Sequence, residues 1–139
     1  MAEERDFTFL NCLCYLYNAF AVYTDGDLDE AEKNEIRNIV GEWCPDQSRN
    51  DVSSSLDKTL GWFSEDLKAD LEEEDSQKVP SMCVGIARSL KENMTPENCK
   101  AVHNDLVRIG NADGHYDETE QKWATALGKE MGEIGRAHV

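Results

Sequence analysis

The sequence has no apolar stretch that approaches the roughly 20 residues of a membrane span. Its first six residues, MAEERD, carry the wrong charge for a secretory signal peptide. Basic residues are also few, because 14 lysines and arginines stand against 29 acids and leave a formal net charge of −15. This charge repels nucleic-acid phosphates and anionic lipids. We therefore expect a cytoplasmic protein with no nucleic-acid partner and no membrane span, whose unidentified protein partner has a basic surface.

The sequence also lacks the features that enzymes commonly show. It has three histidines and neither a Gly-rich phosphate loop nor a nucleophile elbow. Its five cysteines are odd in number and show no repeated pair spacing, which argues against a disulfide framework or a zinc site. Cys12 and Cys14 point about 200° apart on a helix, so we expect them to pack in the core. We predict no enzymatic activity, and a thiol enzyme using Cys12 or Cys14 is a distant alternative.

The length of 139 residues and the 40% content of apolar residues predict one globular domain. The last six residues, IGRAHV at 134–139, resemble the translation of a sequencing-library adapter and are excluded from the fold prediction. We assign the domain to residues 1–133 and expect the natural chain to continue past Met131.

Apolar residues recur at the helical period along the chain, and no useful stretch alternates as a strand would. We predict an all-α bundle of about six to seven helices. The first helix, about Arg5 to Tyr23, is apolar on two faces, with Phe7 on one of them, and should therefore be central. A second helix follows the turn at residues 25–26 and ends before Pro45.

The remaining helices are predicted from their first turns. The third begins near Asn50, with a kink at Gly61 or a restart at Ser64, and runs into the acidic stretch EDLKADLEEED, whose end we expect to be a solvated surface without chemistry. The fourth carries Pro80 in its first turn. Thr95 caps the fifth helix, and Glu118 begins the sixth.

An acidic octapeptide occurs twice, 88 residues apart. Residues 25–32 read DGDLDEAE, residues 113–120 read DGHYDETE, and five of the eight positions are identical. Each copy joins two predicted helices, and the apolar positions downstream correspond. The chain is therefore predicted to contain a pseudo-twofold repeat of helix–acidic loop–helix units.

Two interpretations of the acids in these loops remain open. In the first, the spacing Asp-x-x-Glu forms a capping box at each helix start, and Asp25 and Asp113 accept hydrogen bonds from their own turns. In the second, the acids bind a cation. Each copy matches positions five, six, eight, nine and twelve of an EF-hand calcium loop, but the first and third positions lack acids, which excludes an ordinary EF-hand.

Two half-sets of ligands would complete a site for a hard cation, calcium or magnesium, if the two loops meet in the fold. The predicted metal ligands are Asp25, Asp27, Asp29, Glu32, Asp113, Asp117 and Glu120.

The units VYTDGDLDEAE and GNADGHYDETE resemble those of the TerB-like domain family, found in tellurite-resistance proteins and at the N-terminus of membrane-anchored DnaJ-like co-chaperones. The resemblance spans about Phe7 to Gly132. It implies an all-helical domain, an acidic metal-associated site formed by both loops, and a non-enzymatic role in stress-response complexes. The alternative is a metal-free acidic scaffold or protein-interaction domain whose loops only cap helices.

Overall fold

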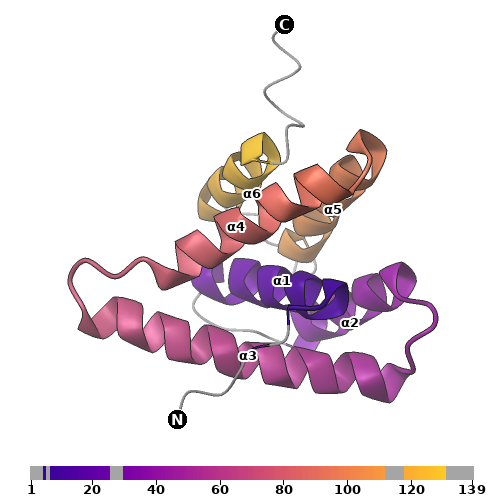
Figure 1. The fold of residues 1–139 in the computed structure, drawn as a ribbon, viewed down its shortest axis with the longest axis horizontal. Coiled ribbons are helices and arrows are strands. Elements are labelled where there is room, and N and C mark those ends of the chain that lie inside the picture. Colours follow the sequence, from indigo (N-terminus) through magenta and orange to yellow (C-terminus); the bar gives the residue numbers. More distant parts are fainter. Residues whose placement is uncertain (1–4, 6, 26–29, 112–117, 131–139) are drawn as a thin grey trace, which may run out of the picture.

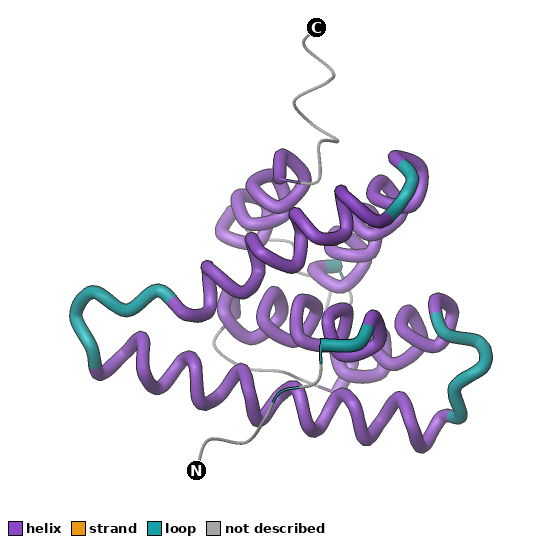
Figure 2. Tube along the Cα trace, viewed as in Figure 1, coloured by secondary structure: helices purple, strands orange, loops and turns teal. Residues whose placement is uncertain are grey.

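The structure is a computed structural model that describes residues 5, 7–25, 30–111 and 118–130. These residues form six helices and no strand, in one compact bundle, which confirms the all-α prediction (Figures 1 and 2). The helices are α1 (Phe9–Asp25), α2 (Glu30–Trp43), α3 (Arg49–Glu72), α4 (Lys78–Asn93), α5 (Pro96–Gly110) and α6 (Glu118–Glu130).

Helix α1 lies at the centre of the bundle and contacts each of the other five helices (Figure 1). This central position was predicted from its two apolar faces. Its middle is buried around the whole circumference, so even polar side chains such as Asn18 are enclosed there. The fully buried apolar residues of α1 are Leu13, Cys14, Tyr15, Leu16, Tyr17, Ala19, Phe20 and Ala21.

The predicted start of α1 at Arg5 is wrong, because the helix begins at Phe9. The Thr8 hydroxyl accepts a hydrogen bond from the Asn11 amide at 3.1 Å, and the Thr8 carbonyl accepts one from Cys12 at 2.9 Å. Thr8 is therefore the N-cap that the apolar periodicity concealed. As a consequence Phe7 lies outside the helix and is 52% exposed, rather than on its inward face.

The other helix boundaries follow local sequence signals. Helix α2 ends at Trp43, two residues before Pro45, and Thr95 caps α5 by accepting a hydrogen bond from the Asn98 amide. Ser48 and Asp51 form a capping box at the start of α3. This helix continues without a break through Gly61, so neither the predicted kink nor the restart occurs.

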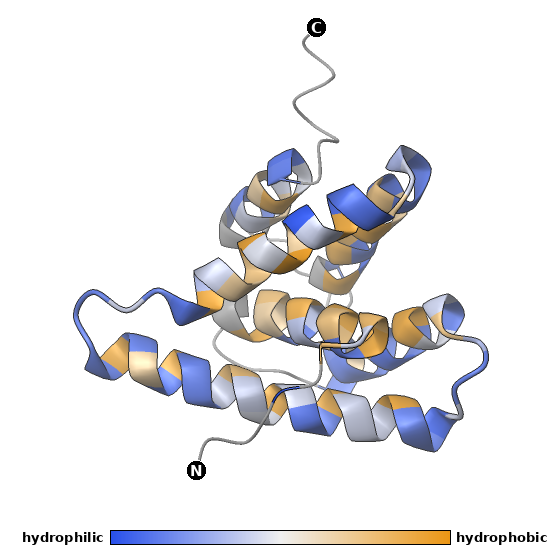
Figure 3. Cartoon of the chain, viewed as in Figure 1, coloured by the Kyte–Doolittle hydropathy of each residue, from blue (hydrophilic) through white to orange (hydrophobic). Residues whose placement is uncertain are grey.

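In Figure 3, the orange, hydrophobic parts of the helix ribbons lie mainly toward the interior of the bundle. The blue, hydrophilic parts lie mainly toward the outside. In the part of the chain that the structure describes, no helix combines the length and the apolar character needed to cross a membrane.

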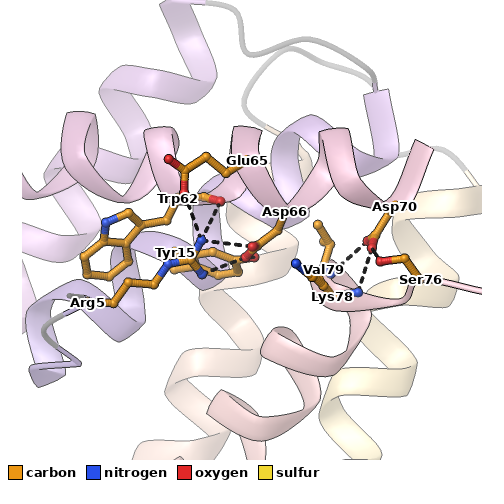
Figure 4. A network of polar contacts seen from close by, with 9 residues as sticks. All are labelled: Arg5, Tyr15, Trp62, Glu65, Asp66, Asp70, Ser76, Lys78 and Val79. Atoms are coloured by element: carbon orange, nitrogen blue, oxygen red, sulfur yellow. Dashed lines mark hydrogen bonds and ion pairs between the residues drawn. The ribbon is translucent and has the colours of Figure 1, made fainter. Parts of the chain in front are cut away.

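For the acidic stretch at residues 65–75, the prediction of a solvated surface concerned its end. Residues 72–75 are exposed, as expected. Asp66, however, is buried, and Asp70 accepts hydrogen bonds from the Lys78 amide at 2.7 Å and the Val79 amide at 2.9 Å. Asp70 thus caps α4 from α3 and joins two helices that are consecutive in the chain (Figure 4). Burial opposes ionisation, but hydrogen bonds from Ser76 and these amides lower the pKa of Asp70 overall.

Replacing Asp70 with alanine should lower the free energy of unfolding by about 1 kcal/mol, because the first amides of α4 lose their acceptor. Urea denaturation at pH 7 measures this loss. Asp75→Ala removes the same charge from an exposed position of the same connection and should change the stability much less. Equal losses for the two variants would show that Asp70 does not act as a cap.

Candidate cation site and its supporting contacts

The seven predicted metal ligands lie on the two helix–loop–helix units of the bundle. Asp25 is the last residue of α1, Glu32 is the third residue of α2, and Glu120 is the third residue of α6. The other predicted ligands lie outside the described residues, and these are Asp27, Asp29, Asp113 and Asp117.

Glu32 is the predicted ligand whose side chain the structure describes, and it is only 2% exposed. Glu30, two residues earlier, is exposed. A carboxylate withdrawn from water requires hydrogen bonds or a positive charge to offset its desolvation. Burial of Glu32 fits both open interpretations, since a capping-box glutamate and a cation ligand each turn toward the loop that precedes the helix.

The two helix–loop–helix units also bury equivalent positions after their loops. Ile36 and Ile39 of α2 correspond to Ala124 and Leu127 of α6, and all four are buried. This is the correspondence expected from the repeat. The last predicted pair, Trp43 with Met131, has only Trp43 within the described residues, where it is partly buried.

Three helices are joined at Asp105, a residue of α5 that the sequence analysis did not single out. Its Oδ2 atom accepts a hydrogen bond from the Tyr17 hydroxyl of α1 at 2.8 Å and another from the Trp43 indole N–H of α2 at 2.6 Å. Asp105 falls three residues after the buried Val102, so helical periodicity alone could have indicated that it turns inward.

Arg108, one turn further along α5, binds two acids of α2. Its Nε atom lies 2.6 Å from Glu35 Oε1, and its Nη2 atom lies 3.3 Å from Glu42 Oε2. Asn98, near the start of α5, lines a cavity together with Trp43 at the end of α2, whereas Arg108, near the end of α5, reaches back to Glu35. Helices α2 and α5 therefore run antiparallel here.

This antiparallel arrangement bears on where the two acidic loops begin and end. Arg108, in the last turn of α5 before the second loop, reaches Glu35 in the N-terminal half of α2, which follows the first loop, as well as Glu42 near the end of α2. Glu35 is one turn, about 4.5 Å of helix rise, from the buried Glu32. The contacts of Arg108 thus bring the end of α5 toward the turn of α2 that carries a predicted ligand.

The environment of Asp105 also affects its protonation. Burial raises the pKa of its carboxyl group, while the hydrogen bonds from Trp43 and Tyr17 and the charge of Arg108 lower it, and burial dominates. A carboxyl group whose pKa is higher in the folded than in the unfolded state favours folding most below its unfolded value. That contribution is lost as the pH rises through the folded pKa.

We therefore expect Asp105→Asn to gain stability relative to the wild type as the pH rises from below the ordinary aspartate pKa into the neutral range. Asparagine keeps an oxygen that can accept from Tyr17 and Trp43 but carries no charge to desolvate. Urea unfolding at several pH values measures the difference. Asp57→Asn, at an exposed position of α3, controls for the removed charge. A stability difference that falls with pH relative to that control would contradict this assignment.

Two further groups bear on possible chemistry. Within the described ranges, no three His, Cys, Asp or Glu side chains are arranged to hold a metal ion, but most predicted ligands lie outside those ranges. All five cysteines are free thiols. Burial raises the pKa of Cys12, and burial together with Cys44 raises that of Cys14 to about 12, so both are protonated at neutral pH. Because the thiolate is the nucleophile, this argues against the thiol-enzyme alternative.

Asp66 of α3 is a second carboxylate that the sequence pattern did not single out, and it is buried. It accepts a hydrogen bond from the Tyr15 hydroxyl of α1 at 2.7 Å and binds the Arg5 guanidinium (Figure 4). Its burial could have been predicted, because Asp66 lies three residues after Phe63 and seven after Thr59, and both of these residues are buried. The many acids around it concealed this periodicity.

No protein-family model, curated protein or solved structure matches the chain. The resemblance to TerB-like domains therefore remains a prediction that depends on the two acidic units.

Proposed function

We propose that the chain is a non-enzymatic interaction module whose two acidic loops bind a divalent cation, calcium or magnesium. The observation that carries the proposal is the packing of α5 against α2. Arg108 binds Glu35, one turn from the buried Glu32, which supports loops that approach each other at one end of the helix pair. Oxygen ligands of this kind suit hard cations. The proposed ligands are Asp25, Asp27, Asp29, Glu32, Asp113, Asp117 and Glu120.

The repeat supports a single shared site over two separate ones. Each loop alone supplies about half of the ligands that calcium takes, which number six to eight oxygens. The high negative charge of the chain would also attract cations to such a site. The resemblance to TerB-like domains extends the proposal to a cytoplasmic role in a stress or tellurite response, through a protein partner with a basic surface.

The alternative is a metal-free scaffold in which the same acids cap α2 and α6. Glu32 has the capping-box spacing, and its burial fits that role equally. The two functions differ in what they require of the charge. A helix cap needs only an oxygen that accepts a hydrogen bond, whereas a cation site needs an oxygen that carries negative charge.

Glu32→Gln separates these functions, because glutamine also serves in a capping box but supplies no charge to a cation. In the chelator-treated wild type, calcium or magnesium at 100 times its dissociation constant should stabilise the fold by about 2.7 kcal/mol, which raises the unfolding temperature by several degrees. In Glu32→Gln this shift should largely disappear at the same ion concentration, while the stability without the ion stays unchanged or rises. Differential scanning calorimetry measures both quantities.

Glu30→Gln is the matched control, since it removes the same charge from an exposed position of the same helical turn. It should keep the full response, and sodium at equal ionic strength should not reproduce the response of the wild type. Asp29→Asn and Asp117→Asn keep a capping oxygen and should behave like Glu32→Gln. If all three variants retain a normal calcium and magnesium response, the acids are helix caps and the cation assignment is wrong.

A further inference from the structure

The segment before α1 is held on the surface of α3 by a charged contact. Both terminal nitrogens of Arg5 lie 2.9 Å from oxygens of the Asp66 carboxylate, which is the bidentate geometry of an arginine–carboxylate pair (Figure 4). Nη2 of Arg5 also lies 3.3 Å from Glu65. The Asp66 side chain is 7% exposed and that of Arg5 is 21% exposed. The nearly buried carboxylate of Asp66 is therefore bound by the guanidinium of Arg5, a residue that lies outside the helices.

The same segment contacts the indole ring of Trp62, one turn before Asp66. The Arg5 guanidinium lies 5.6 Å from the ring centre, and the Phe7 ring centre lies 5.6 Å from that of the indole. Trp62 is 3% exposed, and its indole N–H has no hydrogen-bond acceptor among the residues that the structure describes. A buried donor of this kind costs stability unless an acceptor reaches it.

The segment fills this surface incompletely. Phe7 is 52% exposed and Phe9 is 43% exposed. Two cavities, of 420 and 270 Å³, lie beside Phe7, and both are lined by Cys12 and Ile86. Space thus remains around the aromatic ring for apolar groups that the described residues do not supply.

We propose that the surface around Trp62 and Asp66 is a recognition site for a protein segment that carries an arginine two residues before an aromatic residue. Arg5 and Phe7 occupy this site as a displaceable strap. By strap we mean Arg5 and Phe7, and Thr8, the N-cap of α1, is not part of it. A basic partner suits this site, because the chain carries a net charge of −15 and Glu65 stands exposed beside Asp66. The proposal goes beyond the cation site and does not depend on it.

Displacement of the strap is a competition between one tethered and one free segment. A short tether holds the strap at an effective concentration in the millimolar range. A partner with the same arginine and aromatic pair must therefore gain additional contacts. The two cavities beside Phe7 and the Trp62 indole N–H, which has no acceptor among the described residues, are where it would gain them. Weakening the strap should open the site to a free peptide.

A binding titration tests this. The full chain, as wild type and as Arg5→Ala, is titrated into a fluorescently labelled peptide AKKRAFT, which keeps the arginine and phenylalanine of residues 2–8 and replaces their acids, in buffer containing chelator, and anisotropy is followed. We expect Arg5→Ala to bind the peptide at least tenfold more tightly than the wild type. A peptide carrying Arg5→Lys should bind more weakly, because lysine lacks the bidentate fork. Adding Asp66→Asn to the Arg5→Ala chain should abolish binding.

Two further variants make the outcome unambiguous. Phe7→Ala loosens the strap but leaves Asp66 paired with Arg5, so it covers the case in which Arg5→Ala fails to fold. It should give an intermediate gain in affinity. Arg49→Ala removes an exposed arginine from the first turn of α3 and should bind the peptide as the wild type does. Equal affinity of the wild type, Arg5→Ala and Phe7→Ala, or no saturable binding to any of them, would overturn the proposal. Because no divalent cation is present, this result would not affect the cation site.

Discussion

The Asp105 carboxylate is the acceptor on which the arrangement of three helices depends. One of its oxygens accepts hydrogen bonds from the Tyr17 hydroxyl of α1 and from the Trp43 indole N–H of α2. Asp105 lies on α5, one turn before Arg108. The Tyr17 hydroxyl cannot reach water without a movement of α1, because Tyr17 is fully buried, whereas Trp43 is only partly buried. The interaction therefore holds α5 against the C-terminal end of α2, and Arg108 holds the last turn of α5, after which the second acidic loop begins.

Helix α1 makes this constraint necessary. Its burial on all sides encloses two tyrosine hydroxyls, and each must find an acceptor within the protein. Tyr17 finds Asp105 of α5, and Tyr15 finds Asp66 of α3, so the two carboxylates hold opposite neighbours of the central helix. Burial raises the pKa of both tyrosines, so both remain hydrogen-bond donors at neutral pH. A helix with apolar residues alone would pack without fixing its neighbours in this way.

Much of the fold could be predicted from the sequence, and several of the errors concern polar residues. Proline and capping signals located the ends of α2 and the start of α5, and two apolar faces identified α1 as central. Besides the kink at Gly61, which does not occur, the predictions that failed concerned polar residues whose partners are not visible in the apolar pattern. Arg5 was predicted to lie in the first turn of α1, but Thr8 caps the helix after it. Asp66 was not singled out among the acids around it, but Tyr15 and Arg5 bind it. Of the candidate cation site, only the burial of Glu32 is described, and the loops themselves lie outside the described residues.

The central claim is that the packing of α5 on α2 unites the two acidic loops in one cation site. The most direct test is a calcium titration of ¹⁵N-labelled, chelator-treated protein that follows the amide resonances of Gly26 and Gly114, one in each loop. The account predicts that both resonances shift with a single midpoint, while sodium at equal ionic strength shifts neither. Resonances that move only as they do in sodium, or a shift confined to one loop, would contradict a shared site.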